Sequence, residues 1–223
     1  MIGKVAIEGA PPRDVAPLAV LEGTLDDQAR IDRTTAVATD FLRTRGYPYA
    51  TIKVERHTGC GVELAAFVDR GPRYHIADIE LHSDATLPPG DARAALEDGL
   101  GTVNAIGGAY VADRLTRALT ALVHRYRDAG WLDASADAPR ADWDQATHTV
   151  SLAIALHPGR RYKIGKLVAR PRVIEALGLK GGDWFEAGTL RSALERARRR
   201  LARRLAVTIS VASERAAIDV EVK

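Results

Sequence analysis

Alternation of apolar and polar residues marks two strands in the middle of the chain, Tyr74–Leu81 and Thr147–Leu156. Between them, Val111–Ala129 has apolar residues three and four positions apart, the spacing of an amphipathic helix. A shorter helix is expected over Asp91–Asp98, stopped by glycines at positions 99 and 101, and a further strand near Ala134. These segments predict the order strand, helix, helix, strand, strand.

The segments on either side repeat this order. Before it we expect a strand over Lys4–Glu8, helical residues over Pro12–Leu21, a helix from Asp26 or Asp27 to Arg45, and a hairpin of Thr51–Arg56 and Val62–Asp69. After it we expect a strand over Tyr162–Ala169, helices over Pro171–Leu177 and Ala187–Leu205, and a hairpin of Val207–Ala212 and Ala216–Val222.

A phrase that occurs twice separates these segments. Val68–Ile76 recurs as Leu156–Ile164, and each copy closes one alternating segment and opens the next. Such a repeat predicts a tandem array of modules, over residues 1–72, 73–160 and 161–223. We expect the repeated residues to form the junctions and to set the angle between modules. They are Gly71, Arg73, Tyr74, Gly159, Arg161 and Tyr162.

Composition limits the kinds of protein that remain. The chain is 46% hydrophobic, enough for real cores, yet it has no apolar run of the roughly 18 residues that a membrane-spanning helix needs. Its single cysteine, Cys60, lies between two glycines, so no disulfide within the chain is possible. The net charge of +3 is uneven, because residues 161–223 contain 15 basic and 7 acidic side chains.

Arginines concentrate on one predicted helix, 190–205, opposite a stripe of leucine and alanine. They are Arg191, Arg196, Arg198, Arg199, Arg200, Arg203 and Arg204. This basic face is either an ordinary solvated surface or a surface for anionic lipid headgroups or an acidic partner. Nucleic-acid binding is a weaker alternative, because no aromatic residues are interleaved for stacking and no nucleic-acid-binding motif is present.

No arrangement of residues points to catalysis. The six histidines are scattered without metal-ligand spacing, and the glycine-rich segment 99–108 lacks the Lys-Ser/Thr of a phosphate loop. Asp142–Asp144 is interpreted as a loop before a strand. We therefore expect a protein that is not an enzyme and has neither a metal nor a cofactor.

The repeated Gly-x-Arg-Tyr-x-Ile phrase, a glycine–aromatic pair after the long helix at Gly46-Tyr47 and Gly130-Trp131, and the stretch Leu179–Phe185 resemble POTRA domains. These are periplasmic modules that precede the β-barrel in outer-membrane assembly and secretion proteins of the BamA/TamA superfamily, and the TamA-like members are the most similar. The resemblance implies an α+β fold of three tandem β-α-α-β-β modules. Each would be a three-stranded mixed sheet with two helices on one face. The last module departs from the pattern, since no glycine–aromatic pair follows its long helix.

Such a module suggests how it would bind a client. A three-stranded sheet leaves edge strands that can accept an extended chain through main-chain hydrogen bonds. The resemblance implies a groove between the second strand and the longer helix, with edges at Thr51–Arg56, Ala134–Asp137 and Val207–Val211. The first and third alternate well, whereas Pro139 weakens the middle one. The expected client-binding residues are Ile52, Val54, Val207, Ile209 and Val211, although these strands could equally be ordinary protected edges.

The function expected from the resemblance is the binding and delivery of unfolded outer-membrane or secreted proteins. The chain would lie in the periplasm of a Gram-negative bacterium, attached to the outer membrane. The resemblance also implies a companion assembly subunit as a partner. A C-terminal β-barrel in the same protein is expected, because the chain stops abruptly after a strand. The alternative from another class is a free-standing scaffold of the cell envelope with the same fold and no barrel.

Overall fold

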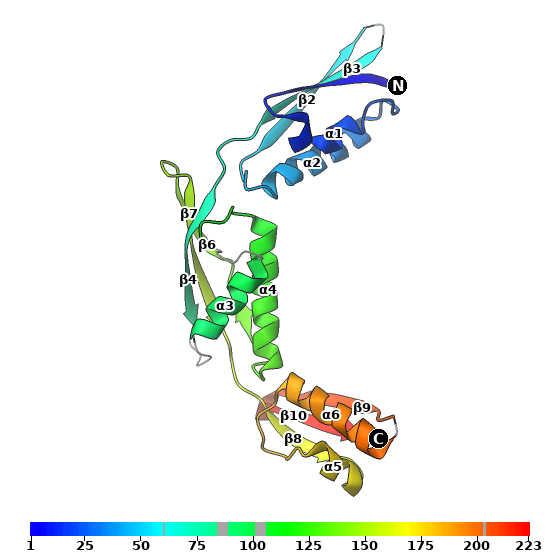
Figure 1. Cartoon of the computed structure of the whole chain (residues 1–223), viewed down its shortest axis with the longest axis vertical. Coiled ribbons are helices and arrows are strands. Elements are labelled where there is room, and N and C mark those ends of the chain that lie inside the picture. Colours follow the sequence, from blue (N-terminus) through cyan, green and yellow to red (C-terminus); the bar gives the residue numbers. More distant parts are fainter. Residues whose placement is uncertain (60, 84–88, 101–105, 203) are drawn as a thin grey trace. The chain divides into compact units, whose positions relative to one another are not determined.

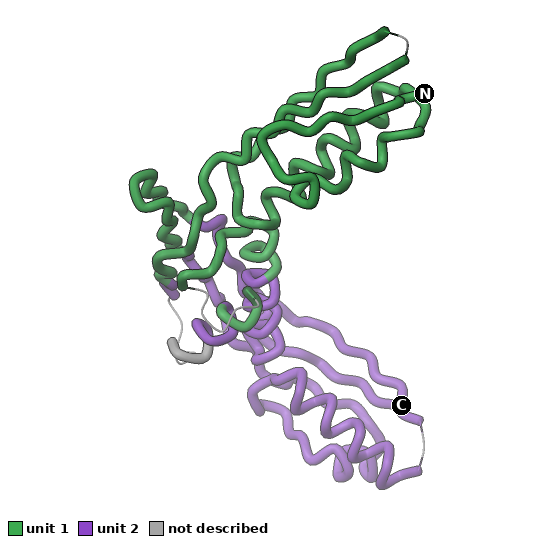
Figure 2. The backbone as a smooth tube through the Cα atoms, turned by 45° about the horizontal axis from the view of Figure 1, so that its top comes forward, with its two compact units in different colours: residues 1–80, 97–117, 140–153 green, residues 81–96, 118–139, 154–223 purple. Residues whose placement is uncertain are grey.

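The computed structural model describes residues 1–59, 61–83, 89–100, 106–202 and 204–223 (Figure 1). Cys60, Arg203 and residues 101–105 of the glycine-rich segment lie outside the described residues. The chain divides into two compact units, coloured green and purple in Figure 2. One consists of residues 1–80, 97–117 and 140–153, and the other of residues 81–96, 118–139 and 154–223.

The first compact unit contains a three-stranded mixed sheet. Its strands are β1 (Ile2–Glu8), β2 (Thr51–Thr58) and β3 (Val62–Asp69), in the order β1-β3-β2. β3 pairs with β1 in parallel and with β2 in antiparallel orientation, so β1 and β2 are the edges. Between β1 and β2 the chain forms η1 (Pro12–Asp14), α1 (Ala16–Ala19) and α2 (Gln28–Arg43).

Helices α1 and α2 cover one face of this sheet (Figure 1). On β3, Leu64 and Val68 are buried on the covered face, while Phe67 points to the opposite face and is exposed. Asp27, one of the two predicted caps, precedes the first residue of α2, and its carboxylate accepts the N–H of Ala29 at 3.2 Å. Alternation along β3 therefore decides which face of the strand enters the core, and α2 buries the side that contains Ile31, Ala38 and Leu42.

The same unit contains β6 (Arg140–Asp144), the beginning of β4 (His75–Ser83) and the first part of β7 (Thr149–His157). β6 and β7 form an antiparallel hairpin, so the prediction of a loop over Asp142–Asp144 was wrong. The carboxylate of Asp144 closes the turn, because its Oδ1 accepts the N–H of Ala146 at 2.8 Å. Hydrogen bonds from Thr147, by its side chain and its N–H, and from Ala146 lower the pKa of Asp144.

The middle sheet differs from the prediction of three strands. Its order is β4-β7-β5, with β6 also paired to β7, which makes four strands among the described residues. β5 (Ser135–Ala136) and β6 pair with successive parts of β7, and Pro139, which has no N–H to donate, lies between them. Helices α3 (Pro89–Leu100) and α4 (Ala112–Asp128) complete this region. α3 continues through Gly99, predicted to stop it, because packing of the buried Leu100 outweighs the glycine's low helix propensity.

The second compact unit contains the last sheet. Its strands are β8 (Lys163–Val168), β9 (Val207–Ala212) and β10 (Ala217–Val222), in the order β8-β10-β9. β10 is parallel to β8 and antiparallel to β9, and η2 (Ser213–Arg215) joins β9 to β10. The architecture of the first sheet is thus repeated.

Helices α5 (Pro171–Leu177) and α6 (Ala187–Leu201) bury their apolar sides against the last sheet. α5 ends where predicted, at Gly178, whose φ of +66° suits glycine. α6 was predicted to continue to Leu205 but ends at Leu201, and Ala202 follows in the left-handed conformation with φ +49°. The chain turns there so that Leu205 can enter the core.

The α+β class predicted from the sequence is confirmed, with mixed sheets and helices in both units. The module boundaries 1–72, 73–160 and 161–223 stay predictions.

Candidate functional site

The edge strand β9 has exposed apolar side chains on the core side of its sheet. In the register of β9 with β10, Val207, Ile209 and Val211 each lie opposite a buried residue of β10 and so face the same side. Only Val207 packs against the core, whereas Ile209 is 49% exposed and Val211 54%. The side chains that cover β10 therefore leave the outer part of β9 open.

β9 also lacks the residues that usually protect an edge strand. Its sequence, Val-Thr-Ile-Ser-Val-Ala, has no charged residue and no proline. The other edge of the same sheet, β8, has Lys163 and Lys166. β9 is therefore open to pairing with another extended chain.

The predicted client residues Ile52 and Val54 lie on β2, at an edge of the first sheet. Both are half-buried and pack against the core, unlike Ile209 and Val211. β2 also has charged residues at its edge, including Lys53, whose ammonium lies 2.8 Å from a carboxylate oxygen of Glu55. β2 thus presents less apolar surface than β9.

Two backbone groups of the predicted middle edge, Ala134–Asp137, have hydrogen-bond partners, one of them on the neighbouring strand β7. The guanidinium of Arg127 donates to the carbonyl of Ala134 at 2.9 Å, and the N–H of Asp137 donates to the carbonyl of Ala155 at 3.0 Å. β5 is only two residues long. This segment is therefore a poor template for strand addition.

The two predicted junctions have the same backbone hydrogen bond. The N–H of Tyr74 donates to the carbonyl of Gly46 at 2.9 Å, and the N–H of Tyr162 donates to the carbonyl of Gly130 at 2.7 Å. Gly46 and Gly130 have φ of +92° and +101°, a conformation that glycine adopts without strain. The repeated phrase and the glycine–aromatic pair therefore meet in space.

Aromatic rings surround the first junction. The ring of Tyr74 lies edge-on to Tyr49 at 5.6 Å and to Trp143 at 4.9 Å, and Tyr110 contacts Trp143 at 5.0 Å. A Cβ added to Gly71 would lie 3.8 Å from the Cβ of Tyr49. Trp143, on β6, was not expected to take part in this junction.

At the second junction a guanidinium lies between two indole rings. Arg161 is 4.7 Å from the ring centre of Trp131 and 4.9 Å from that of Trp184. The same guanidinium donates to the carbonyl of Ala129 at 3.3 Å and to Glu186 at 3.2 Å. Arg161 is thereby held by contacts with both the end of α4 and the start of α6.

Gly159 and Asp133 approach closely at the same junction. A Cβ added to Gly159 would lie 2.8 Å from the Cβ of Asp133. The fully buried Tyr162 donates its hydroxyl hydrogen to the Asp133 carboxylate. All these contacts lie inside the second compact unit.

The predicted basic face lies on α6 and is exposed. Arg200 pairs with Glu175 at 2.9 Å, whereas Arg191, Arg196 and Arg199 have no carboxylate partner among the described residues. The predicted Arg203 lies outside the described residues. The exposed guanidiniums are therefore free to meet an anionic surface.

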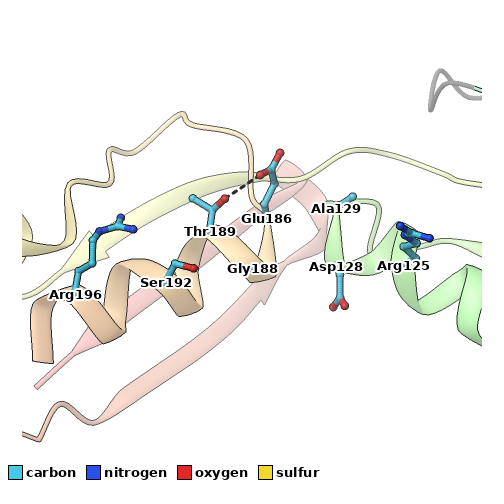
Figure 3. A pocket seen from close by; sticks show the side chains of 8 residues that line it. All are labelled: Arg125, Asp128, Ala129, Glu186, Gly188, Thr189, Ser192 and Arg196. Carbon is cyan, nitrogen blue, oxygen red and sulfur yellow. Dashed lines mark hydrogen bonds between the residues drawn. The ribbon is translucent and has the colours of Figure 1, made fainter. Parts of the chain in front are cut away.

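A shallow cavity of about 600 Å³ lies between the end of α4 and the first turns of α6 (Figure 3). Arg125 and Asp128 line it from α4, and Glu186, Thr189 and Arg196 from the other side. Thr189 donates to Glu186 at 2.9 Å, the dashed line in Figure 3. This contact belongs to the first turn of α6, and nothing in it points to a ligand.

Neither a metal site nor a membrane-spanning helix is found in the part of the chain that the structure describes. No group of three or more His, Cys, Asp or Glu side chains is arranged to hold a metal ion in the described ranges. Over the same ranges, no helix is long and apolar enough to cross a membrane.

No protein-family model and no curated protein matches the sequence of this chain. The crystal structure of POTRA domains 3–5 of BamA from Haemophilus influenzae is similar to it over 100% of this chain and 94% of that one, with a TM-score of 0.51 and 16% identity. The crystal structure of BamA from Haemophilus ducreyi lacking POTRA domains 1–3 is also similar. The likeness covers 74% of this chain and 30% of that one, with a TM-score of 0.52 and 13% identity.

This chain has the POTRA fold. At such identities the likeness concerns the fold alone, and the TamA-like subtype stays a prediction. Within the POTRA fold, β2 and β9 occupy matching edges of their sheets, each antiparallel to the central strand. The contact between Trp143 and Tyr74 gave no sequence signal, because the residues are far apart in the chain and belong to no shared pattern.

Proposed function

We propose that this chain is the periplasmic part of an outer-membrane protein of a Gram-negative bacterium, one that assembles or translocates outer-membrane or secreted proteins. The likeness of its fold to POTRA domains of BamA supports this proposal. The stretch Leu179–Phe185 favours a TamA-like member with a β-barrel in the same protein. Its modules would span residues 1–72, 73–160 and 161–223.

The client strand is proposed to add to β9. The observation that carries this step is the half-exposed pair Ile209 and Val211, on the core side of an uncharged edge strand. An incoming extended chain would form main-chain hydrogen bonds with β9 and cover these two side chains with its own apolar residues. Backbone pairing tolerates many sequences, which suits a receptor for many unfolded clients. β2 is a second, weaker edge, since Ile52 and Val54 are already half-buried.

The exposed arginines of α6 are proposed to contact anionic lipid headgroups. Arg191, Arg196 and Arg199 lie on one helix, exposed and without carboxylate partners among the described residues. Basic residues near an anionic membrane surface are each worth about 1 kcal/mol of binding. A companion assembly subunit is proposed to bind the chain at a further surface.

The test of strand addition is the binding of a labelled extended peptide, with alternating apolar and polar residues, to the full chain. Fluorescence anisotropy would compare the parent with a variant carrying Ile209→Lys and Val211→Lys. We expect the variant to bind at least about tenfold more weakly, because charge at an edge strand blocks pairing.

The matched control is Val168→Lys on β8, the opposite edge of the same sheet, where the side chain is 56% exposed. This control should bind the peptide as the parent does. Equal loss in both variants, or no loss in either, would refute strand addition at β9.

A further inference from the structure

A cavity of about 490 Å³ in the first compact unit gathers five arginines around one carboxylate. The arginines are Arg13, Arg45, Arg70, Arg73 and Arg114, and the carboxylate is Asp14. They come from η1, the turn after α2, the segment between β3 and β4, and the start of α4. No run of basic residues in the sequence signals this cluster.

Asp14 holds two of the arginines in place. Its Oδ1 accepts Arg45 at 2.6 Å and its Oδ2 accepts Arg70 at 3.3 Å, and the Asp14 side chain is only 14% exposed. The Arg45 guanidinium also lies 4.4 Å over the ring of Phe41, and that of Arg70 lies 5.6 Å from the ring centre of Tyr47. These two guanidiniums are therefore fixed before any ligand arrives.

The other three arginines lack a counter-charge. Of the residues that the structure describes, none provides a carboxylate in ion-pair contact with Arg13, Arg73 or Arg114. Arg73 is packed beside Gly46, where an added Cβ would lie 3.3 Å from its Cγ. Five guanidiniums and one carboxylate leave an excess of four positive charges around one cavity. Like charges that line one cavity repel one another, and a bound anion would offset that repulsion.

We propose that this cavity binds an acidic segment of a partner protein. Guanidinium groups match carboxylates in shape and charge and form paired hydrogen bonds with them. The five arginines are spread over several elements, so a chain with successive carboxylates can reach more of them than one small anion can. Tyr47, Ala109 and Val111 add apolar lining for the carbon parts of such a segment. This site is independent of strand addition at β9.

The test uses the full chain and a fluorescein-labelled short peptide of alternating glutamate and alanine, with the glutamine counterpart as a neutral peptide. We expect the acidic peptide to bind and the neutral one not to bind. Affinity should fall as salt is raised, since the arginines at the rim are exposed. Arg73→Gln with Arg114→Gln should weaken binding about tenfold or more, because each removes a charge-assisted hydrogen bond.

The matched control is Arg30→Gln with Arg43→Gln, two exposed residues of α2 outside the cavity. It changes the net charge equally and should leave binding within about twofold of the parent. Equal losses in both double variants would overturn the proposal, because binding would then follow net charge alone. Binding of inorganic phosphate or pyrophosphate that displaces the peptide and needs Arg73 and Arg114, at much higher affinity, would overturn it in favour of a small-anion site.

The variant with Ile209→Lys and Val211→Lys separates the two proposals. It should bind the acidic peptide as the parent does. Loss of acidic-peptide binding in that variant would contradict a site in this cavity, whereas failure of strand addition alone would leave the cavity result standing.

Discussion

The hydroxyl of Tyr162 donates to the carboxylate of Asp133, at 3.1 Å to Oδ1, while the N–H of the same tyrosine bonds to Gly130. The corresponding Tyr74 keeps the backbone bond to Gly46 but meets the ring of Tyr49 instead of a carboxylate. The repeated phrase thus preserves the backbone contact and varies its side-chain partner.

Tyr162→Phe should lower the free energy of unfolding of the second compact unit by about 1 kcal/mol, because it removes one side-chain hydrogen bond without opening a large cavity. Calorimetry would measure the thermal transition. Tyr47→Phe is the control, since no hydrogen bond of the Tyr47 hydroxyl is found among the described residues. A Tyr162→Phe variant as stable as the parent would show that the bond to Asp133 contributes nothing.

Gly46→Ala should destabilise the first compact unit by more than the roughly 1–2 kcal/mol that a left-handed conformation costs alanine. Gly46 has φ +92°, and an added Cβ would lie 2.8 Å from the Cβ of Ala109. Gly23→Ala is the control for strain alone, because Gly23 has φ +73° and nothing within 4 Å. Urea unfolding would compare the two. Equal losses of stability in the two variants would contradict this prediction, because the contact with Ala109 would then add nothing to the backbone strain.

Asp219 gives the last sheet a predicted dependence on pH. Its carboxylate accepts the N–H of Lys166 at 2.7 Å where the register of β8 and β10 shifts, and Arg215 at 2.9 Å. The hydrogen bond from Lys166, followed by the charge and hydrogen bond of Arg215, lowers the pKa of Asp219. A lowered folded-state pKa means that this stabilisation is present above the unfolded pKa of about 3.9 and is lost as the pH falls through the folded value.

Asp219→Asn should therefore be less stable than the parent near neutral pH, and the difference should shrink as the solution is acidified below about pH 4. Thermal unfolding across that range is the measurement, and the neighbouring Glu214→Gln is the control. If the difference in stability between Asp219→Asn and the parent stays constant with pH, the charge of Asp219 does not contribute to the stability of the sheet.

Replacing Arg191, Arg196 and Arg199 by glutamine should weaken binding to vesicles containing anionic lipid by up to about 1 kcal/mol for each residue. Vesicle sedimentation at low and high salt is the measurement, and both the parent's binding and the difference should diminish at high salt. Glutamine at Arg30, Arg33 and Arg43 of α2 is the charge-matched control. Unchanged vesicle binding in the α6 variant would show that this face is an ordinary solvated surface and does not bind lipid.

Local patterns predicted most of the elements of this chain. The bounds of α5 and β9 follow from Pro171, Gly178 and the alternation of Val207–Ala212, each of which acts over a few residues. β6 was missed because Arg-Ala-Asp-Trp-Asp has little β-branched or apolar content, and its pairing with β7 decides its conformation. The end of α6 was missed because burial of Leu205, a tertiary contact, stops the helix early.

The candidate sites also include features that the sequence predicted and features that depend on tertiary contacts. The position of β9 at an edge was expected from the resemblance to POTRA domains, and the strand order β8-β10-β9 confirms it. The exposure of Ile209 and Val211 depends on which part of the sheet the helices cover, and alternation alone does not fix it. The arginines around Asp14 come from segments as far apart in the chain as Arg13 and Arg114, so no local pattern predicts that cluster.

Amide hydrogen exchange of the full chain, with and without an extended amphipathic client peptide, tests strand addition most directly. Binding should slow exchange of amides in Val207–Ala212, leave those of β8 unchanged, and have no effect in the variant carrying Ile209→Lys and Val211→Lys. Protection confined to β2 or β8, or binding without protection of β9, would contradict the account.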